Sequence, residues 1–309
     1  MKNNYITSGR EDHDTIFLKW HINTQCQYRC DYCYFKKSLN KVEPTGNKTA
    51  YVNVLKRVSL KTIPKFNMDL LGGEPTLHDD IDIIIKSLCM NNKCNEINLH
   101  TNMVRSIEWY SKYDQQQFNK LKINGSYHPQ YEKSKDKFVE TSVGVNKFKH
   151  VSYVCNINIY EKMWREIKAV IIDLLDHGVP IGLQMLSSVS DVWNEEYTDE
   201  FVDEFNIFLR DTEQRYGVSL FRSQDVKFTD KDNNTTIIDD YNVRLKELDI
   251  FYGWSCKATF WDIQPDGSIR NGCTGEPLLL NNKNISECVT CPLTTGCPCT
   301  DCYNFYKHE

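Results

Sequence analysis

Six short apolar segments alternate with longer segments of helical periodicity between about residues 15 and 220. The apolar segments have the pattern of strands and span residues 15–23, 65–73, 94–102, 120–128, 148–159 and 179–188. Segments 79–90, 160–178 and 198–217 place apolar residues at intervals of three and four, as a helix packed by one face requires. This alternation predicts parallel strands joined by crossover helices, and therefore an α/β architecture. An open sheet and a partial barrel both fit the pattern, and both bring ligand chemistry to the carboxyl ends of the strands.

Charge and hydropathy exclude several classes of function. The 309 residues carry a net charge of −5, which gives no basic footprint for non-specific nucleic-acid binding. A nucleotide or a specific RNA substrate stays open. The N-terminus lacks the apolar core of a secretory signal, and no uncharged run approaches the roughly 18 to 20 residues of a membrane span. We therefore expect a cytoplasmic protein without a membrane partner.

Thirteen cysteines are unusual for such a protein, and ten of them are clustered. In a reducing compartment, clustered cysteines hold metal more often than they form disulfides. The first cluster comprises Cys26, Cys30 and Cys33, and the second comprises Cys256, Cys273, Cys288, Cys291, Cys297, Cys299 and Cys302. The three remaining cysteines are expected to be small buried apolar residues: Cys89, Cys94 and Cys155.

The first cluster has the spacing C-x3-C-x2-C and follows directly after the first predicted strand. A structural zinc ion would need a fourth cysteine or histidine, and the nearest histidine, His21, lies within the strand pattern. A 4Fe–4S cluster held by three cysteines instead leaves one iron open to an exogenous ligand.

The residues Cys26, Cys30, Tyr32 and Cys33 resemble the cluster motif of radical S-adenosylmethionine (radical SAM) enzymes, which carry an aromatic residue before the third cysteine. The resemblance implies a partial (β/α)6 barrel and a 4Fe–4S cluster whose open iron is chelated by S-adenosylmethionine. It further implies reductive cleavage to a 5′-deoxyadenosyl radical that abstracts hydrogen from a substrate, with a flavodoxin- or ferredoxin-like electron donor.

A second motif, GGEP at Gly72, Gly73, Glu74 and Pro75, follows the second predicted strand. Two glycines allow the backbone to approach a ligand closely, and an acidic side chain can bind an ammonium group. In radical SAM enzymes the matching segment binds the methionine amino group. A plain turn between strand and helix is the alternative explanation.

Further residues occupy positions at which the family carries cofactor contacts. Thr101 and Asn102 end the third strand, and Ser126 ends the fourth, where the family's ribose contact commonly lies. Gln184 lies in the sixth strand pattern and could face the barrel interior. His128 is a weak candidate for a substrate-facing acid or base, and a turn residue is the alternative. Each of the others could also be a polar strand end.

The second cysteine cluster begins around a predicted hairpin. Residues 251–273 show apolar alternation, the turn PDG and a second short strand, with Cys256 and Cys273 on either side. The spacings C-x2-C and C-x5-C, at Cys288, Cys291 and Cys297, are typical of metal ligands. A zinc ribbon built from two cysteine pairs also fits this spacing.

The order of cysteine, hairpin with Gly267, cysteine and C-x2-C-x5-C is similar to the SPASM or twitch extension of radical SAM enzymes. That resemblance implies one or two auxiliary 4Fe–4S clusters. Cys256, Cys273, Cys288 and Cys291 match the single-cluster twitch arrangement. The remaining ligands would complete a second, open cluster or be unused: Cys297, Cys299 and Cys302.

We therefore expect a radical SAM enzyme with four segments: an N-terminal tail (1–14), a partial barrel (15–228), a connector (229–250) and a small Cys-rich Fe–S domain with a β-hairpin (251–309). The substrate is a peptide or protein side chain, a nucleotide or a small molecule. Only about 15 residues precede the first strand, which slightly disfavours a separate peptide-recognition domain. The alternative is a non-catalytic zinc-binding α/β protein with a zinc-ribbon tail.

Overall fold

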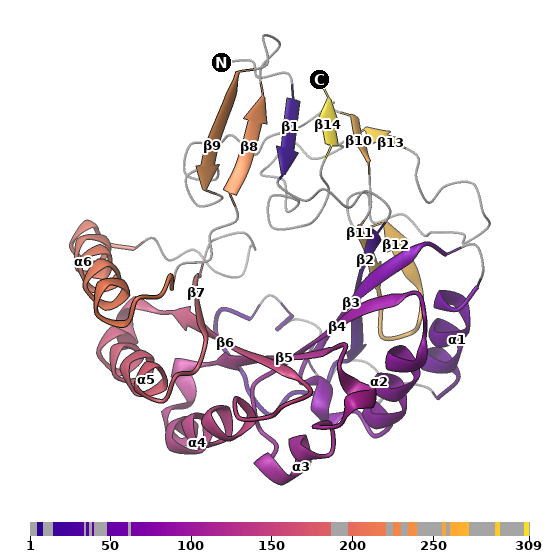
Figure 1. The fold of residues 1–309 in the computed structure, drawn as a ribbon, viewed down its shortest axis with the longest axis horizontal. Helices are drawn as coiled ribbons and strands as arrows, with labels where there is room; N and C mark the ends of the chain where they lie inside the picture. The colour runs from indigo at the N-terminus through magenta and orange to yellow at the C-terminus, as the bar shows by residue number, and fades with distance from the viewer. Residues whose placement is uncertain are drawn as a thin grey trace.

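Six parallel strands form a curved sheet whose outer face is covered by helices (Figure 1). The strands are adjacent in chain order, and every neighbouring pair is parallel. This confirms the predicted α/β fold with a mostly parallel sheet. The strands are β2 (Thr15–Asn23), β3 (Lys65–Gly72), β4 (Cys94–Thr101), β5 (Leu121–Tyr127), β6 (Ser152–Ile159) and β7 (Ile181–Met185).

The structure is a computed structural model. It describes residues 5–8, 15–33, 35–36, 39, 48–60, 63–186, 197–220, 225–229, 234–239, 255–257, 260–271, 288–290 and 306–308.

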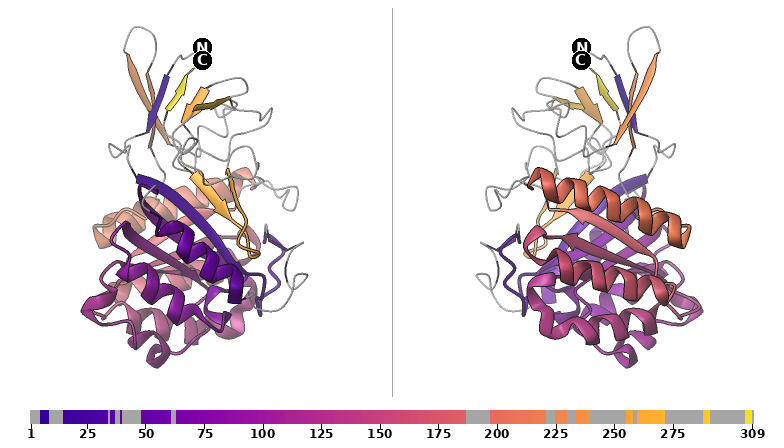
Figure 2. Two further views of the ribbon diagram at one scale, coloured as in Figure 1. Left: turned by 90° about the vertical axis from the view of Figure 1, so that its right-hand side faces the viewer. Right: turned by 90° about the vertical axis from the view of Figure 1, so that its left-hand side faces the viewer.

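Among the described residues, five helices lie in the connections between the parallel strands and a sixth follows the last of these strands, all on the convex side of the sheet (Figures 1 and 2). They are α1 (Lys48–Val58), α2 (Ile81–Met90), α3 (Ile107–Ser111), α4 (Lys135–Val145), α5 (Trp164–Asp176) and α6 (Asp199–Tyr216). Short 3₁₀ turns accompany them: η1 (Pro75–Leu77), η2 (Gln116–Phe118), η3 (Pro129–Ser134) and η4 (Glu161–Met163). Within the described residues, no helix combines the length and apolarity that crossing a membrane requires.

The two faces of the sheet differ in polarity. Met68 and Ile97, which are in register, are completely buried, and both belong to the core formed with the helices. Asp69 and Asn98 are the next register pair and therefore share the opposite, concave face. Lys19 of β2 is in register with Asp69. Strand alternation thus packs apolar side chains between the sheet and the helices and places polar side chains on the concave face.

The hairpin predicted around the PDG turn is present, as β11 (Phe260–Ile263) and β12 (Ile269–Asn271). The turn places Gly267 at φ 81°, a conformation that glycine adopts without a Cβ penalty. β11 pairs in parallel with β2, so the hairpin extends the barrel sheet. The free edge of β2 offers unpaired backbone groups that β11 satisfies.

A second sheet of six strands lies across the open side of the curved sheet (Figures 1 and 2). Its order is β13 (Cys288–Thr290), β10 (Ser255–Lys257), β14 (Tyr306–His308), β1 (Tyr5–Ser8), β8 (Asp225–Thr229) and β9 (Thr235–Asp239). β1 falls in the expected tail 1–14, and β9 falls in the expected connector 229–250. These segments differ from expectation because long-range pairing leaves no local periodicity in such short strands. The four-part division stays a prediction.

Candidate functional site

The three-cysteine loop begins where β2 ends, at the carboxyl end of the parallel sheet. Cys30 is buried, with 5% of its surface exposed, and Cys26 and Cys33 are half-buried. Burial raises the pKa of Cys26 to about 11 and that of Cys30 to about 12. The neighbouring thiolates raise the pKa of Cys30 further. The three cysteines thus occupy one partly buried loop at this edge of the sheet.

Each of these sulfur atoms faces hydrogen-bond donors. The backbone N–H of Tyr28 donates to Cys26 Sγ at 3.3 Å. The backbone N–H groups of Phe35 and Lys36 donate to Cys33. A thiolate that ligates a metal centre can only accept hydrogen bonds, so this surrounding suits ligation. The residues present thus fit a cluster held by three cysteines.

Cys30 has side-chain neighbours from another part of the chain. Its sulfur lies 3.5 Å from His128 Nδ1, and it hydrogen-bonds with the Tyr32 hydroxyl. The Tyr32 hydroxyl is also 3.1 Å from His128 Nδ1, and the two rings stack with centroids 6.0 Å apart. Burial lowers the pKa of His128 to about 4. His128 therefore lies against the cysteine loop as a neutral side chain.

The two glycines of GGEP let two chain segments pack backbone to backbone. A Cβ on Gly73 would lie 2.1 Å from the carbonyl oxygen of Gln25, and one on Gly72 would lie 2.5 Å from that of Asn23. Gly73 N–H donates to the Asn23 carbonyl at 3.1 Å, and Glu74 N–H to the Gln25 carbonyl at 2.6 Å. The glycines thus hold the end of β3 against the start of the cysteine loop, a packing role that neither the ligand contact nor the plain turn considered in the sequence analysis included.

Glu74 is 1% exposed, and its carboxylate is held from inside the protein. Oε1 accepts from Thr76 N–H at 3.0 Å and from the hydroxyls of Thr76 and Thr101 at 2.6 and 2.7 Å. Oε2 accepts from Asn102 N–H at 2.7 Å. Burial raises the pKa of Glu74, and these hydrogen bonds partly offset the effect. The expected contact with a methionine amino group stays a prediction. Oε2 would make it, because this oxygen accepts one hydrogen bond here whereas Oε1 accepts three.

Asn102 joins the cysteine loop to the end of β4. Its Oδ1 accepts from Gln27 Nε2 at 2.8 Å, and its Nδ2 lies 3.9 Å from Cys26 Sγ. Thr101 supports the same corner through its bond to Glu74. Asn102 therefore lies next to the first cysteine, and its expected contact with the cofactor stays a prediction.

The other expected contacts lie farther along the sheet. Ser126 is half-buried near the end of β5 and is in register with Asn156. Gln184 is exposed on β7, in register with Asn158. β5 and β6 lie between β4 and β7 in the sheet, and among the described residues no hydrogen bond or ring contact joins Gln184 to the cysteine loop. Its predicted role would have to involve a ligand that spans several strands.

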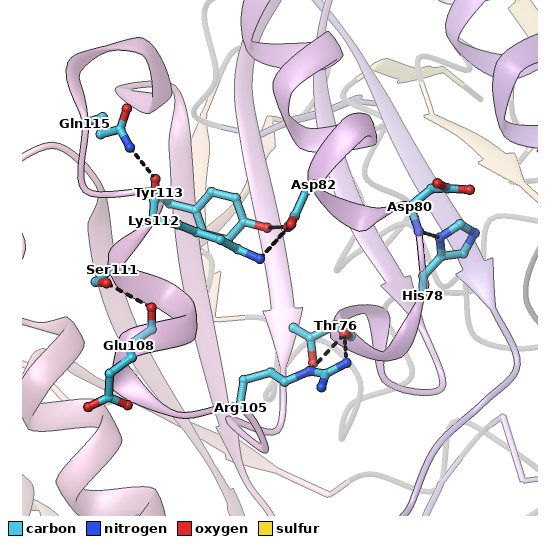
Figure 3. A network of polar contacts seen from close by, with 10 residues as sticks. All are labelled: Thr76, His78, Asp80, Asp82, Arg105, Glu108, Ser111, Lys112, Tyr113 and Gln115. Atoms are coloured by element: carbon cyan, nitrogen blue, oxygen red, sulfur yellow. Dashed lines mark hydrogen bonds and ion pairs between the residues drawn. The ribbon is translucent and has the colours of Figure 1, made fainter.

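The short turn η1 is also held from the outside of the molecule, as Figure 3 shows. The Arg105 guanidinium donates to the Thr76 carbonyl through Nε at 3.1 Å and Nη2 at 2.8 Å. Nearby, Lys112 forms an ion pair with Asp82 at 2.7 Å. Thr76 also donates two hydrogen bonds to the Glu74 carboxylate, so Arg105 stabilises the turn that positions Glu74 beside the cysteine loop.

The concave face carries a polar cluster below the cysteine loop. Asp69 Oδ1 accepts from Asn98 Nδ2 at 2.9 Å, and Asp69 Oδ2 lies 3.9 Å from His100 Nε2. Asn124 Nδ2 donates to Asn98 Oδ1 at 3.4 Å. The His100 side chain is 31% exposed, so the cluster is accessible in part. Sequence reasoning missed it, although polar residues alternate regularly along these strands.

Two of the tail cysteines lie in described strands. β10 and β13 are antiparallel neighbours, with Cys256 opposite Val289 and Cys288 opposite Lys257. The two cysteines are thus one register position apart. The other candidate ligands lie outside the described residues: Cys273, Cys291, Cys297, Cys299 and Cys302.

Comparisons with known proteins agree with the motifs. The family model of the Radical SAM superfamily matches residues 20–204. The GTP 3′,8-cyclase of Pasteurella multocida (strain Pm70) is 29% identical over 93 residues, which cover 29% of this chain and 26% of that protein. The chain thus matches about a quarter of the length of that curated relative.

Solved structures of native anSMEcpe share the fold. The form with bound AdoMet is 15% identical with a TM-score of 0.57, covering 83% of this chain and 74% of that chain. The form with bound AdoMet and Cp18Cys peptide is 14% identical with a TM-score of 0.57, covering 85% and 75%. At this identity the likeness establishes the fold alone.

Proposed function

Because this chain belongs to the radical SAM superfamily, we propose that it binds a 4Fe–4S cluster through Cys26, Cys30 and Cys33 and cleaves S-adenosylmethionine. When bound, the reduced cluster would supply the electron that converts S-adenosylmethionine to methionine and a 5′-deoxyadenosyl radical. The chain's own residues position the cysteines, exclude water and hold the substrate.

The observation that carries this proposal is the environment of the three cysteines. The three cysteines share one loop at the carboxyl end of β2, and N–H or O–H donors lie near their sulfur atoms. Three ligands rather than four leave room for an exogenous chelator. The zinc alternative is not favoured, since it accounts neither for the three-ligand loop nor for the family match.

We further propose that the tail is a SPASM- or twitch-like domain with one or two auxiliary 4Fe–4S clusters. Cys256 and Cys288 lie on neighbouring strands one register position apart, and strand alternation assigns them to opposite faces of the second sheet. The proposal for the tail therefore rests on the spacing of its cysteines and on the resemblance. Cys273 and Cys291 would complete one cluster, and Cys297, Cys299 and Cys302 would serve a second, open one. The electron donor would be a flavodoxin- or ferredoxin-like protein of the cytoplasm.

The substrate is best sought among polar molecules. The concave face presents a carboxylate, an imidazole and two amides at Asp69, His100, Asn98 and Asn124. Buried polar groups of this kind require hydrogen-bonding partners, which an apolar substrate cannot provide. A nucleotide, a peptide or protein side chain, and a polar small molecule all meet this condition.

The first experiment measures iron, sulfide and zinc in anaerobically purified protein, followed by reduction with S-adenosylmethionine and chromatography for 5′-deoxyadenosine. Two or three clusters correspond to about eight to twelve irons per chain. Cys30→Ala should abolish 5′-deoxyadenosine formation while the iron of the tail is retained. Zinc without sulfide and without cleavage would refute the proposal.

A further inference from the structure

The cysteine loop is docked onto a segment that follows β5, about a hundred positions farther along the chain. We call His128, Gln130 and Tyr131 of this segment the loop clasp. All three contact residues between Tyr28 and Tyr32, the part of the loop that contains Cys30. The proposed function assigns no role to Gln130 or Tyr131, and sequence reasoning considered His128 only as a weak acid–base candidate.

Two clasp residues bind the backbone of the loop. The Arg29 N–H donates to the Tyr131 hydroxyl, and the Asp31 N–H donates to Gln130 Oε1 at 2.9 Å. Gln130 Nε2 in turn donates to Asp31 Oδ2 at 2.8 Å. These N–H groups lie immediately before and after Cys30. The backbone on both sides of the middle cysteine is therefore held by two side chains of η3.

Ring packing adds to these hydrogen bonds. The Tyr28 and Tyr131 rings stack with centroids 3.9 Å apart and an interplanar angle of 11°. The Tyr28 ring also meets His128 edge-on at 5.8 Å. On the other side, Tyr32 stacks on His128. Aromatic contacts of this kind contribute beyond the apolar area they bury, so the loop has an anchor at both ends of its central turn.

We propose that the loop clasp holds the three-cysteine loop in its ligating geometry before the cluster binds, and that His128 donates a hydrogen bond from Nδ1–H to the Cys30 sulfur. The inference rests on the proposed function, because it takes Cys30 as a cluster ligand. His128 and its two companions are thus positioning residues.

The choice of donor follows from the chemistry of the sulfur. A ligating thiolate has no proton and can only accept, so a ring nitrogen 3.5 Å away contributes a hydrogen bond only as N–H. The Tyr32 hydroxyl is a second donor to the same sulfur. Hydrogen bonds to cluster sulfurs stabilise the reduced, more negative state and raise the reduction potential.

The first test uses the metal-free protein and follows hydrogen exchange of residues 26–36. Tyr131→Phe keeps the ring and removes the acceptor for Arg29 N–H, and Gln130→Ala removes the acceptor for Asp31 N–H. We expect those amides to exchange roughly three- to tenfold faster, each in its own variant, because each loses the hydrogen bond that protects it. The matched control is Gln115→Ala, which removes a side-chain bond to Lys112 far from the loop. Unchanged exchange at Arg29 and Asp31 would overturn the clasp.

The second test measures the reduction potential and the electron paramagnetic resonance spectrum of the cluster held by Cys26, Cys30 and Cys33. His128→Phe keeps a ring to stack on Tyr32 and removes the donor, so the potential should fall and the spectrum should change. His128→Asn retains a side-chain N–H donor and should recover at least half of that difference. If both variants match the wild-type potential, His128 does not donate to Cys30.

The proposed function and the loop clasp are refuted by different results. A wild-type protein that binds no 4Fe–4S cluster refutes the proposed function and, with it, the role of His128 at a ligand sulfur. If the wild-type protein cleaves S-adenosylmethionine but the Arg29 and Asp31 amides exchange in the variants at the wild-type rate, the clasp alone is refuted.

Discussion

At the scale of single residues, two opposing effects act on the cysteines of the loop: burial favours the protonated thiol, and hydrogen-bond donors favour the thiolate. Burial and neighbouring thiolates raise the pKa values of Cys26 and Cys30, which keeps both thiols protonated in the metal-free protein at neutral pH. The donors around each sulfur favour the thiolate that a cluster requires. Cluster binding must therefore displace protons, and the same donors then compensate for part of the buried negative charge.

These pKa values predict slow alkylation of the metal-free protein. The thiolate is the reacting form, so the rate at Cys26 should keep rising up to about pH 11, and that at Cys30 up to about pH 12. An unfolded chain should level off near its ordinary thiol pKa of about 8.5. Peptide mapping by mass spectrometry after timed iodoacetamide treatment measures each site. A plateau of the alkylation rate below pH 9 in the folded protein would contradict the effect of burial on these two pKa values.

Gly73 makes the sharpest steric prediction. A Cβ at this position meets backbone atoms of Gln25, which cannot move without displacing the start of the cysteine loop. Gly73→Ala should cost about 2 to 3 kcal/mol in the free energy of unfolding and lower the iron bound by the loop. Urea unfolding and iron analysis check both effects.

Gly217→Ala is the matched control for that substitution. Gly217 has φ 65° and open space around its Cβ position, so alanine there should cost about 1 kcal/mol through backbone strain alone. Its iron content should stay at the wild-type value. Equal iron loss in both variants would mean that Gly73 acts through general stability.

At the scale of elements, Glu74 couples the ends of β3 and β4. Its carboxylate accepts hydrogen bonds from the turn η1 and from Thr101 and Asn102 at the end of β4. A buried carboxylate without such donors would be strongly destabilising. The strand ends that carry the candidate site are therefore held by one side chain.

Glu74→Gln tests that coupling with almost no change in volume. The amide NH₂ would face Asn102 N–H or the donors at Oε1, leaving at least one buried donor without a partner. We expect a loss of about 2 to 3 kcal/mol in unfolding free energy. The exposed Glu140 on α4 offers the control, since Glu140→Gln should change stability by less than about 0.5 kcal/mol. Equal stability of the two variants in urea would argue against the coupling.

At the scale of the whole molecule, distant segments meet in the second sheet. β1 lies between β14 and β8, so residues 5–8 pair with residues 306–308 on one side and with residues 225–229 on the other. Ile6 is opposite Lys307 on one side and Phe228 on the other. The arrangement makes the N-terminal strand a structural part of the region that carries the tail cysteines.

Ile6→Pro tests that arrangement, because proline removes a ladder donor from a strand paired on both sides. We expect faster proteolysis after residue 250 and a lower iron content, with the iron bound by the first three cysteines retained. Ile6→Val keeps the strand and should behave as wild type. Limited trypsin digestion read by mass spectrometry locates the cuts. Unaltered digestion of Ile6→Pro would show that β1 is dispensable for the tail.

Some of these features were predictable from local patterns, and others were not. The strand pattern at residues 15–23 coincides with β2, because a short run of apolar, β-branched and aromatic residues indicates a buried strand locally. The hairpin was predictable from its PDG turn, but its pairing with β2 was not. Gln130 and Tyr131 carry no sequence signal, since only the packing of β5 beside the loop gives them partners.

The sequence by itself determined the alternation of strands and helices, the three-cysteine loop after the first strand, and the family to which the chain belongs. Periodicity and motif spacing are properties of neighbouring residues, so they can be read without a fold. Only the tertiary structure decided that Glu74 is bound by internal donors, that the glycines face backbone, and that β1 joins the second sheet. Those contacts join residues far apart in the chain, and only the folded geometry selects among their alternatives.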